Sequence, residues 1–335
     1  MTRFSGVWPA LVTPLTEDDH INVSVTRRLV DHLIDAGIGG LYVCGGTGEG
    51  ILLPPTERKA MAETTIEQVN GRVPVIVHVG ATATADAIEL AAHAEQIGAD
   101  GVAAIPPFYY KVGFLGIKEH YELIAAASSL PLYLYYIPSA TGVTVTAAQM
   151  WELCRIPKVA GFKYSAFDLY VLEQILSLGG GTLNVFSGPD QLLAPMLTVG
   201  VDGAIGSTYN LLPRHFVALY NAFQVGNVAE ARAMQSQANR VIDTFTRHGG
   251  LPAVKEMMRM LGLECGYCRR PFRPRWGPPD PLRRRFVPSD APDSGGPHPG
   301  FPRSAPNVHN GLSWLQPSES RKCHFRPFSL NCLFP

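Results

Sequence analysis

Short apolar runs alternate with longer amphipathic stretches from residue 7 to about residue 225. Each apolar run has the length of one buried strand, and each stretch between two runs is long enough for a helix. The eight runs are Val7–Val12, Gly40–Val43, Val73–Val77, Gly101–Ile105, Leu130–Tyr135, Val159–Lys163, Leu183–Phe186 and Gly203–Ile205. The pattern therefore predicts eight strands with helices between them.

The helical stretches show the spacing of one apolar helix face, as Leu29, Leu33 and Ala36 do. Helices are predicted between strands at Ser24–Ala36, Pro55–Val69, Ala83–Ile97 and Ile117–Ala127. After the eighth strand, two more are predicted at about Val228 to Thr246 and about Pro252 to Leu261. We expect these last two helices to pack on the outside of the preceding structure.

Strands that alternate with helices imply parallel pairing through right-handed crossovers. Eight units in roughly 220 residues match a closed (β/α)8 TIM barrel, predicted here for residues 1–225 with a helical extension over 226–272. An open doubly wound sheet is the alternative. Its nucleotide-binding members carry a Gly-x-Gly-x-x-Gly turn after the first strand, whereas Thr13-Pro-Leu-Thr-Glu17 has no glycine.

The composition changes near residue 273, because half of the chain's 28 prolines lie from Pro271 onward. Proline at this density removes hydrogen-bond donors and forbids helices, so residues 273–335 are predicted to form a disordered tail rich in proline and arginine. A docking segment and a coding-frame accident are the alternatives for this tail.

Composition also narrows the functional classes. The chain has 335 residues, 46% of them hydrophobic, and a formal net charge of zero, so no global field attracts nucleic acid or an anionic membrane. The N-terminus lacks the build of a secretory signal, and the six cysteines form no disulfide framework, which favours a cytoplasmic location. Cys265 and Cys268 are interpreted as ordinary thiols rather than zinc ligands, and no metal ion or cofactor is predicted.

Barrel enzymes place their chemistry at the carboxyl ends of the strands, and six of the eight predicted strands end in polar or reactive groups. Lys163 ends the sixth strand. Many lysines at such positions extend to solvent, but an amine buried at a strand end tends to lose its proton and can then attack a carbonyl. Tyr135 ends the neighbouring strand, ~4.8 Å away, where its phenol could transfer protons. Gly45-Gly-Thr-Gly-Glu49 after the second strand suits an anion such as a carboxylate or phosphate, with a plain tight turn as the alternative.

Several motifs in order then resemble a known family. They are Gly46-Thr-Gly-Glu49, Tyr135-Tyr-Ile-Pro138 with Thr141-Gly142, Gly161-Phe-Lys163, and Gly203-Ala-Ile-Gly-Ser-Thr-Tyr-Asn210. Over roughly residues 5 to 272 the chain resembles the class I, Schiff-base-forming aldolase superfamily that holds dihydrodipicolinate synthase and N-acetylneuraminate lyase.

The resemblance implies a role for each matching residue. Lys163 would form the Schiff base with a 2-oxo acid such as pyruvate, Tyr135 would move protons, and Tyr109 would complete a hydroxyl relay that in the synthase crosses a subunit boundary. Gly46, Thr47 and Ile205 would surround the substrate's acid end. In the lyase-like branch the sugar hydroxyls would face Ser165, Gly188, Asp190, Gln191 and Ser207. A homotetramer is expected, since family members are usually tetramers.

Two departures from the family pattern bear on the substrate. Gly46 stands where the family usually carries a hydroxyl residue, and Ala140 stands where its synthases carry an arginine for a second carboxylate. The lyase reading fits better, although the lyases commonly have a glutamate where this chain has Gln191. We therefore expect a lyase that cleaves a 2-oxo sugar acid, such as N-acetylneuraminate, to pyruvate and an aldehyde. A dihydrodipicolinate synthase, a 2-keto-3-deoxy acid dehydratase and a barrel that binds a 2-oxo acid without turnover stay open.

Overall fold

Eight parallel strands form a barrel in the computed structural model, which describes residues 3–272. The strands are β1 (Gly6–Pro9), β2 (Leu41–Val43), β3 (Val75–His78), β4 (Gly101–Ala104), β5 (Leu132–Tyr136), β6 (Val159–Tyr164), β7 (Asn184–Ser187) and β8 (Gly203–Gly206). Their order around the sheet is β1-β8-β7-β6-β5-β4-β3-β2. The Leu11 N–H donates to the Tyr42 carbonyl at 2.8 Å and Ala10 bridges Tyr42, so the sheet closes between its first and last members.

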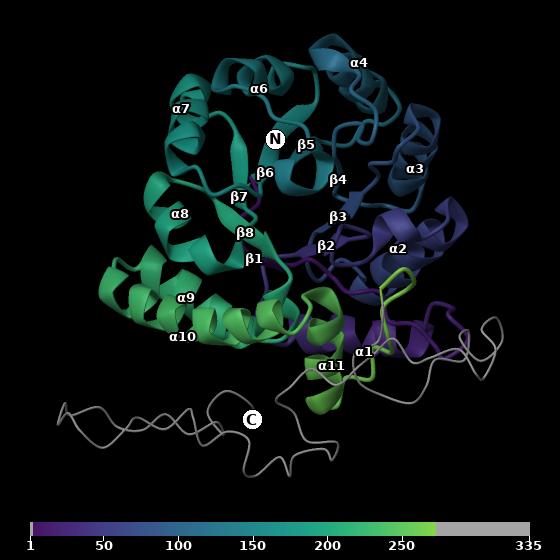
Figure 1. Cartoon of the computed structure of the whole chain (residues 1–335), viewed down its shortest axis with the longest axis vertical. Coiled ribbons are helices and arrows are strands. Elements are labelled where there is room, and N and C mark those ends of the chain that lie inside the picture. Colours follow the sequence, from purple (N-terminus) through teal and green to yellow (C-terminus); the bar gives the residue numbers. More distant parts are fainter. Residues whose placement is uncertain (1–2, 273–335) are drawn as a thin grey trace, which may run out of the picture. The chain divides into compact units, whose positions relative to one another are not determined.

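A ring of helices surrounds the strands (Figure 1). The helices of the ring are α1 (Val23–Ile34), α2 (Pro55–Val69), α3 (Thr84–Gln96), α4 (Gly113–Ala126), α6 (Ala147–Cys154), α7 (Leu169–Gly179), α8 (Leu193–Val199) and α9 (Pro213–Gln224). A single turn, α5 (Pro138–Thr141), follows β5, and 3-10 turns follow β2, β7 and β8 at Gly50–Leu52 (η1), Asp190–Leu192 (η2) and Thr208–Asn210 (η3).

The eight predicted strands are therefore confirmed, and so is the TIM barrel. The first strand is shorter than predicted, since pairing with β8 stops at Pro9 and a lone bridge at Ala10 follows. Beyond Pro9 the hydrogen bonds change partner strand, since the Ala10 N–H still reaches the Gly206 carbonyl of β8 at 2.9 Å and the Leu11 N–H goes to Tyr42 of β2. The predicted helix at Pro55–Val69 has the observed bounds, whereas α4 begins at Gly113, earlier than the apolar pattern indicated.

Two separate apolar layers hold the barrel together, because side chains alternate between its inside and its outside. Trp8, Tyr42, Ile76, Tyr133 and Phe186 are among those that fill the inside. The outward side chains of the strands pack with the inner faces of the helices in a second, larger cluster. Near the interior core, the Tyr133 hydroxyl donates to Asn184 Oδ1 at 2.9 Å, which satisfies a buried phenol.

Two further helices extend the barrel, α10 (Val228–Arg247) and α11 (Leu251–Met260). Asn227 caps α10 by accepting from the Glu230 N–H, and α10 packs along α9 (Figure 1). Beyond α11 the chain reaches residue 272 without further regular structure. The tail predicted for residues 273–335 lies outside the described residues.

No helix within residues 3–272 has the length and apolar character needed to cross a membrane. Over the same part of the chain, no group of three or more His, Cys, Asp or Glu side chains is arranged to hold a metal ion. Cys265 and Cys268 are both free thiols, and burial raises the pKa of each to about 12.

Candidate active site

Lys163 lies inside the barrel with only 4% of its surface exposed. It pairs in register with Tyr135 of the adjacent strand β5, as the sequence predicted. Its Nζ stands 4.2 Å from the centroid of the Tyr135 ring and 4.9 Å from that of the Tyr42 ring. The amine and the phenol therefore converge, and Tyr135 is itself only 6% exposed.

Tyr42 and His78 complete the lining next to this amine, and sequence reasoning did not single them out. The rings of Tyr42 and His78 each meet the Tyr135 ring edge-on, with centroids 6.0 and 5.9 Å away. Burial raises the pKa of Tyr42 well above its usual value. Burial, together with the charges of Arg58 and Lys163, lowers the pKa of His78 well below the usual value of a histidine. Both side chains are thus held neutral. Inward positions on β2 and β3 are the signal that could have identified them.

The glycine-rich turn after β2 lies close to the loop after β8. Thr47 Oγ1 and Ser207 Oγ are 2.7 Å apart, so these two predicted site residues share a hydrogen bond. The turn is closed by bonds from the Glu49 N–H to the Gly46 carbonyl and from the Gly50 N–H to the Gly45 carbonyl. Among residues 3–272, neither the Thr47 N–H nor the Gly48 N–H donates a backbone hydrogen bond. Backbone donors of this kind suit an anionic group.

Asp190 is buried after β7, and its carboxylate is hydrogen-bonded to neighbouring residues. Its Oδ2 accepts both the N–H and the hydroxyl of Thr208, each at 2.7 Å. Burial raises the pKa of this carboxyl group, and the Thr208 bonds oppose that shift. A Cβ at Gly206 would lie 1.7 Å from Asp190 Oδ1, so the carboxylate packs directly against that glycine. Asp190 therefore links the loop after β7 to the loop after β8.

The other predicted residues have differing surroundings. Ser165 is half-buried at the end of β6, and a Cβ at Gly188 would strike its Oγ at 1.8 Å, so these two are in direct contact. Ile205 is buried inside the barrel, and Gln191 is half-buried within η2. Gly46 is exposed on the glycine-rich turn.

Tyr109 is not gathered into the site within this chain. It is 84% exposed, has a left-handed backbone with φ of 77°, and stacks edge-on against Tyr110 at 4.9 Å. No sequence signal separates a tyrosine that lines a pocket from one that points outward in a loop.

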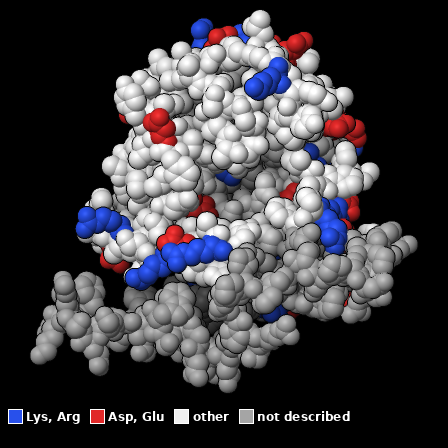
Figure 2. Space-filling view, in the orientation of Figure 1, with Lys and Arg blue, Asp and Glu red and all other residues white. Residues whose placement is uncertain are grey.

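The face shown in Figure 2 is hollowed near its middle, and basic and acidic side chains are visible in and beside the hollow. A buried amine, a neighbouring phenol and unpaired backbone donors are the parts needed to capture a carbonyl compound that carries an acid group.

Comparison with known proteins places this geometry in a family. The model of the dihydrodipicolinate synthetase family matches residues 3–276. The N-acetylneuraminate lyase of Actinobacillus pleuropneumoniae serotype 5b is 35% identical over 273 residues, which cover 81% of this chain and 93% of that protein.

Solved structures are also similar to this chain. The Clostridium difficile protein CdNal, solved in complex with mannosamine, has 33% identity and a TM-score of 0.79, with 81% of this chain and 94% of that chain covered. A Ruminococcus gnavus sialic acid aldolase whose catalytic lysine is mutated has 30% identity and a TM-score of 0.78, with 80% and 90% covered. The barrel, its buried lysine and these likenesses lead to one conclusion: this chain belongs to the dihydrodipicolinate synthetase family.

Proposed function

We propose that the protein is a pyruvate-dependent class I lyase that cleaves a 2-oxo sugar acid, of which N-acetylneuraminate is the first candidate, to pyruvate and an aldehyde. The observation that carries this proposal is the position of the Lys163 amine, buried and 4.2 Å from the Tyr135 ring. The relatives described above, named as N-acetylneuraminate lyase and sialic acid aldolase, support it.

In this mechanism the Lys163 nitrogen attacks C2 of the 2-oxo acid, and Tyr135 gives its proton to the departing hydroxyl, which leaves as water. An iminium ion and a phenolate remain. The C3–C4 bond then breaks, its electron pair moves toward the iminium nitrogen to form an enamine, and C4 leaves as the aldehyde carbon. The Tyr135 phenolate accepts the proton from the C4 hydroxyl and returns it to C3. Water finally releases pyruvate and restores the amine, and the phenolate takes up the proton that this hydrolysis frees.

Substrate binding follows from the two loops that meet at Thr47 and Ser207. The N–H groups of Thr47 and Gly48 hold the carboxylate of the oxo acid, and the buried wall at Ile205 flanks it. Ser165, Gly188, Asp190, Gln191 and Ser207 lie at the ends of β6, β7 and β8, where the hydroxyl groups of a sugar chain would pass. Among these, Asp190 acts by fixing the loops, because its Oδ2 accepts both the N–H and the hydroxyl of Thr208.

Ala140 argues against a synthase that handles a second carboxylate. It lies in the exposed turn α5 after β5 and carries no charge. Release of pyruvate from a sugar acid, compared with condensation of pyruvate and aspartate semialdehyde, separates the two functions.

Reductive trapping tests the central step. Borohydride added with pyruvate should attach a reduced pyruvate to the peptide that holds Lys163, and the Lys163→Met variant should show no labelled peptide and no pyruvate release. The peptide that holds Lys158 is the internal control, since this lysine is engaged with the Ala125 and Ser128 carbonyls. An unlabelled Lys163 in the parent protein would overturn the proposal.

The proposal includes a homo-oligomer in the cytoplasm. Tyr109, Tyr110, Val112 and Leu115 are all exposed and lie together in sequence before and within the start of α4. A second copy of the chain would cover these side chains and would bring Tyr109 toward a site, as the relay requires. Sedimentation of the purified protein should therefore give a mass larger than one chain.

A further inference from the structure

A fully buried ion pair joins the glycine-rich turn to the C-terminal helix α11. Glu49 Oε1 lies 2.7 Å from Lys255 Nζ, and the two side chains are 0% and 1% exposed. Glu49 is two residues from Thr47, whereas Lys255 belongs to an extension that follows the whole barrel. Charges buried to this degree are retained only when each is compensated, so the two residues depend on one another.

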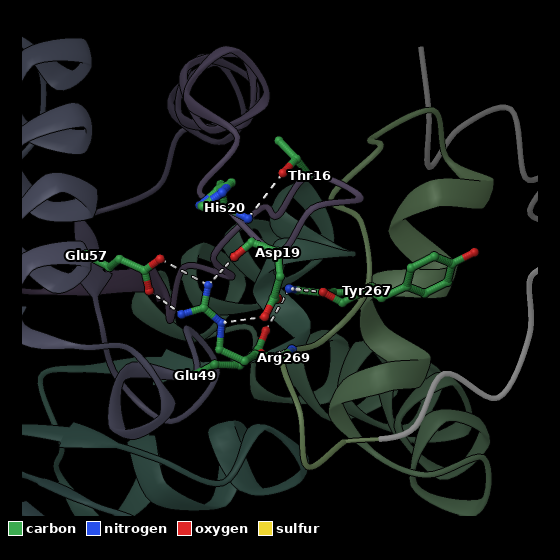
Figure 3. Close-up of polar contacts among 8 residues, drawn as sticks. Thr16, Asp19, His20, Glu49, Glu57, Tyr267 and Arg269 are labelled. Atoms are coloured by element: carbon green, nitrogen blue, oxygen red, sulfur yellow. Dashed lines mark hydrogen bonds and ion pairs between the residues drawn. The ribbon is translucent and has the colours of Figure 1, made fainter. Parts of the chain in front are cut away.

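The segment after α11 encloses this pair. Lys255 Nζ also donates to the Tyr267 carbonyl at 2.9 Å, and the Arg269 N–H donates to the second oxygen of Glu49. The Arg269 guanidinium bonds Glu57, at the start of α2, and lies 3.4 Å from Asp19 Oδ2 (Figure 3). The segment that contains Tyr267 and Arg269 is thereby held against the glycine-rich turn.

The turn has little freedom around Glu49. Its backbone is left-handed, with φ of 57° and ψ of 26°, and a Cβ at Gly50 would lie 1.8 Å from the Cys44 carbonyl oxygen. The Thr13 hydroxyl holds the Gly48 carbonyl at 2.6 Å. The turn therefore holds the Glu49 carboxylate within two residues of the N–H groups of Thr47 and Gly48.

Lys255 supplies the charge that compensates Glu49. Cys268, beside the pair, stays a neutral thiol, because burial and the Glu49 carboxylate raise its pKa to about 12 against the opposing charge of Lys255. The Arg269 guanidinium is engaged by Glu57 and Asp19, and its backbone N–H brings no net charge to Glu49. Without Lys255, Glu49 would leave a negative charge beside a turn that must accept an anion.

We propose that Lys255 is a positioning residue for the substrate carboxylate, acting through Glu49. It cancels the charge of Glu49, so that the backbone donors meet an anion without repulsion from within the protein. This role rests on the proposed function, because it concerns the turn that would hold the acid end of a 2-oxo acid.

Two carbonyl compounds, used as probes of the full-length protein, separate the effect of the ligand's charge from the effect of its shape. Pyruvate carries the carboxylate, whereas methyl pyruvate has the same carbonyl without the charge. The measurement is the concentration of each that gives half-maximal borohydride trapping at Lys163. Lys255→Met should raise this concentration for pyruvate about ten- to one-hundred-fold and for methyl pyruvate less than about threefold, as expected for one uncompensated charge nearby.

Removing the charge of Glu49 should not weaken pyruvate binding as removing the charge of Lys255 does. Glu49→Gln leaves an uncompensated positive charge, so trapping of pyruvate should need no more than the parent's concentration. The double variant, Glu49→Gln with Lys255→Met, replaces the ion pair by a neutral pair, an exchange that proteins often tolerate. It should return pyruvate to within about threefold of the parent. If Lys255→Met does not fold, the Glu49→Gln variant and the double variant are sufficient to test the proposed role.

The matched control is Lys118→Met, which breaks the exposed pair of Lys118 and Glu152, 2.8 Å apart, and should change neither probe. A merely structural role predicts equal effects on both probes in every variant, or a double variant as impaired as a single one, and either result would overturn this role alone. A parent protein that traps neither probe would overturn the proposed function and this role with it.

Discussion

At Gly46 the glycine-rich turn leaves room for a side chain. No heavy atom lies within 4 Å of where a Cβ would stand, and the residue is exposed. Gly50, four residues later, has a Cβ position 1.8 Å from the Cys44 carbonyl oxygen. Close backbone packing therefore requires a glycine at position 50, whereas nothing in the packing requires one at position 46.

Gly46→Ser should consequently fold with stability within ~0.5 kcal/mol of the parent, as for a surface change without new strain. Its hydroxyl would supply the group that the family usually has at this position, so pyruvate release should be at least as fast as in the parent. Urea unfolding and the rate of pyruvate release check both expectations.

Gly50→Ala is the matched comparison, and we expect it to unfold at clearly lower urea because its methyl group meets backbone that cannot rotate away. Equal destabilisation by the two changes would contradict this account of the turn.

At the scale of elements, α10 supports the loop after β7. Gln235 on α10 donates from Nε2 to the Asp190 carbonyl at 3.0 Å and accepts the Ala194 N–H at 2.9 Å. Asn239, one turn later, donates to the Gln191 carbonyl at 3.3 Å. Two predicted site residues thus owe their backbone position to a helix outside the barrel.

Gln235→Leu should cost about 2–3 kcal/mol, because it leaves a buried carbonyl and a buried N–H without partners. By loosening Asp190 and Gln191 it should also raise the KM for a sugar acid more than the concentration of pyruvate needed for trapping. Urea unfolding and steady-state kinetics measure the two effects.

The control is Gln237→Leu on the same helix, where the side chain is only half-buried. A Gln235→Leu protein with the stability and KM of this control would show that α10 does not position the loop.

At the scale of the whole molecule, buried histidines make the fold sensitive to acid. His78, His120 and His215 all have lowered pKa values, with burial as the first cause of each, and that of His120 falls to about 4. Between pH 6.5 and pH 4, these histidines therefore bind protons in the unfolded chain, where their ordinary pKa is about 6.5, but not in the folded state. The stability present above pH 6.5 is lost as the pH falls toward 4.

His120→Gln tests this slope, since the amide can still bond the Thr84 hydroxyl, which lies 2.9 Å from Nδ1 of the histidine. The loss of unfolding free energy between pH 7 and pH 4.5 should shrink by roughly 2 kcal/mol relative to the parent. Urea unfolding at several pH values gives the comparison. His20→Gln, at an exposed position, should leave the slope unchanged, and an unchanged slope in both variants would rule out this origin of acid sensitivity.

Much of the fold and the centre of the site could be read from local patterns. Alternation of apolar runs and helices indicates a barrel, because each strand needs a covering helix on its outer face. Period-two alternation and the pairing of neighbouring strands were enough to bring Tyr135 and Lys163 together, as the register of β5 and β6 confirms. Such features depend on residues close in sequence or on strands adjacent in order.

Only the tertiary structure decided the rest. Tyr42 and His78 join the lysine because the barrel closes, and Glu49 meets Lys255 because α11 folds back beside the first loops. Asp190 is bound to Thr208, and Tyr109 faces outward. These contacts join residues far apart along the chain, and their free energies depend on burial and orientation, which no local pattern of apolar and polar residues encodes.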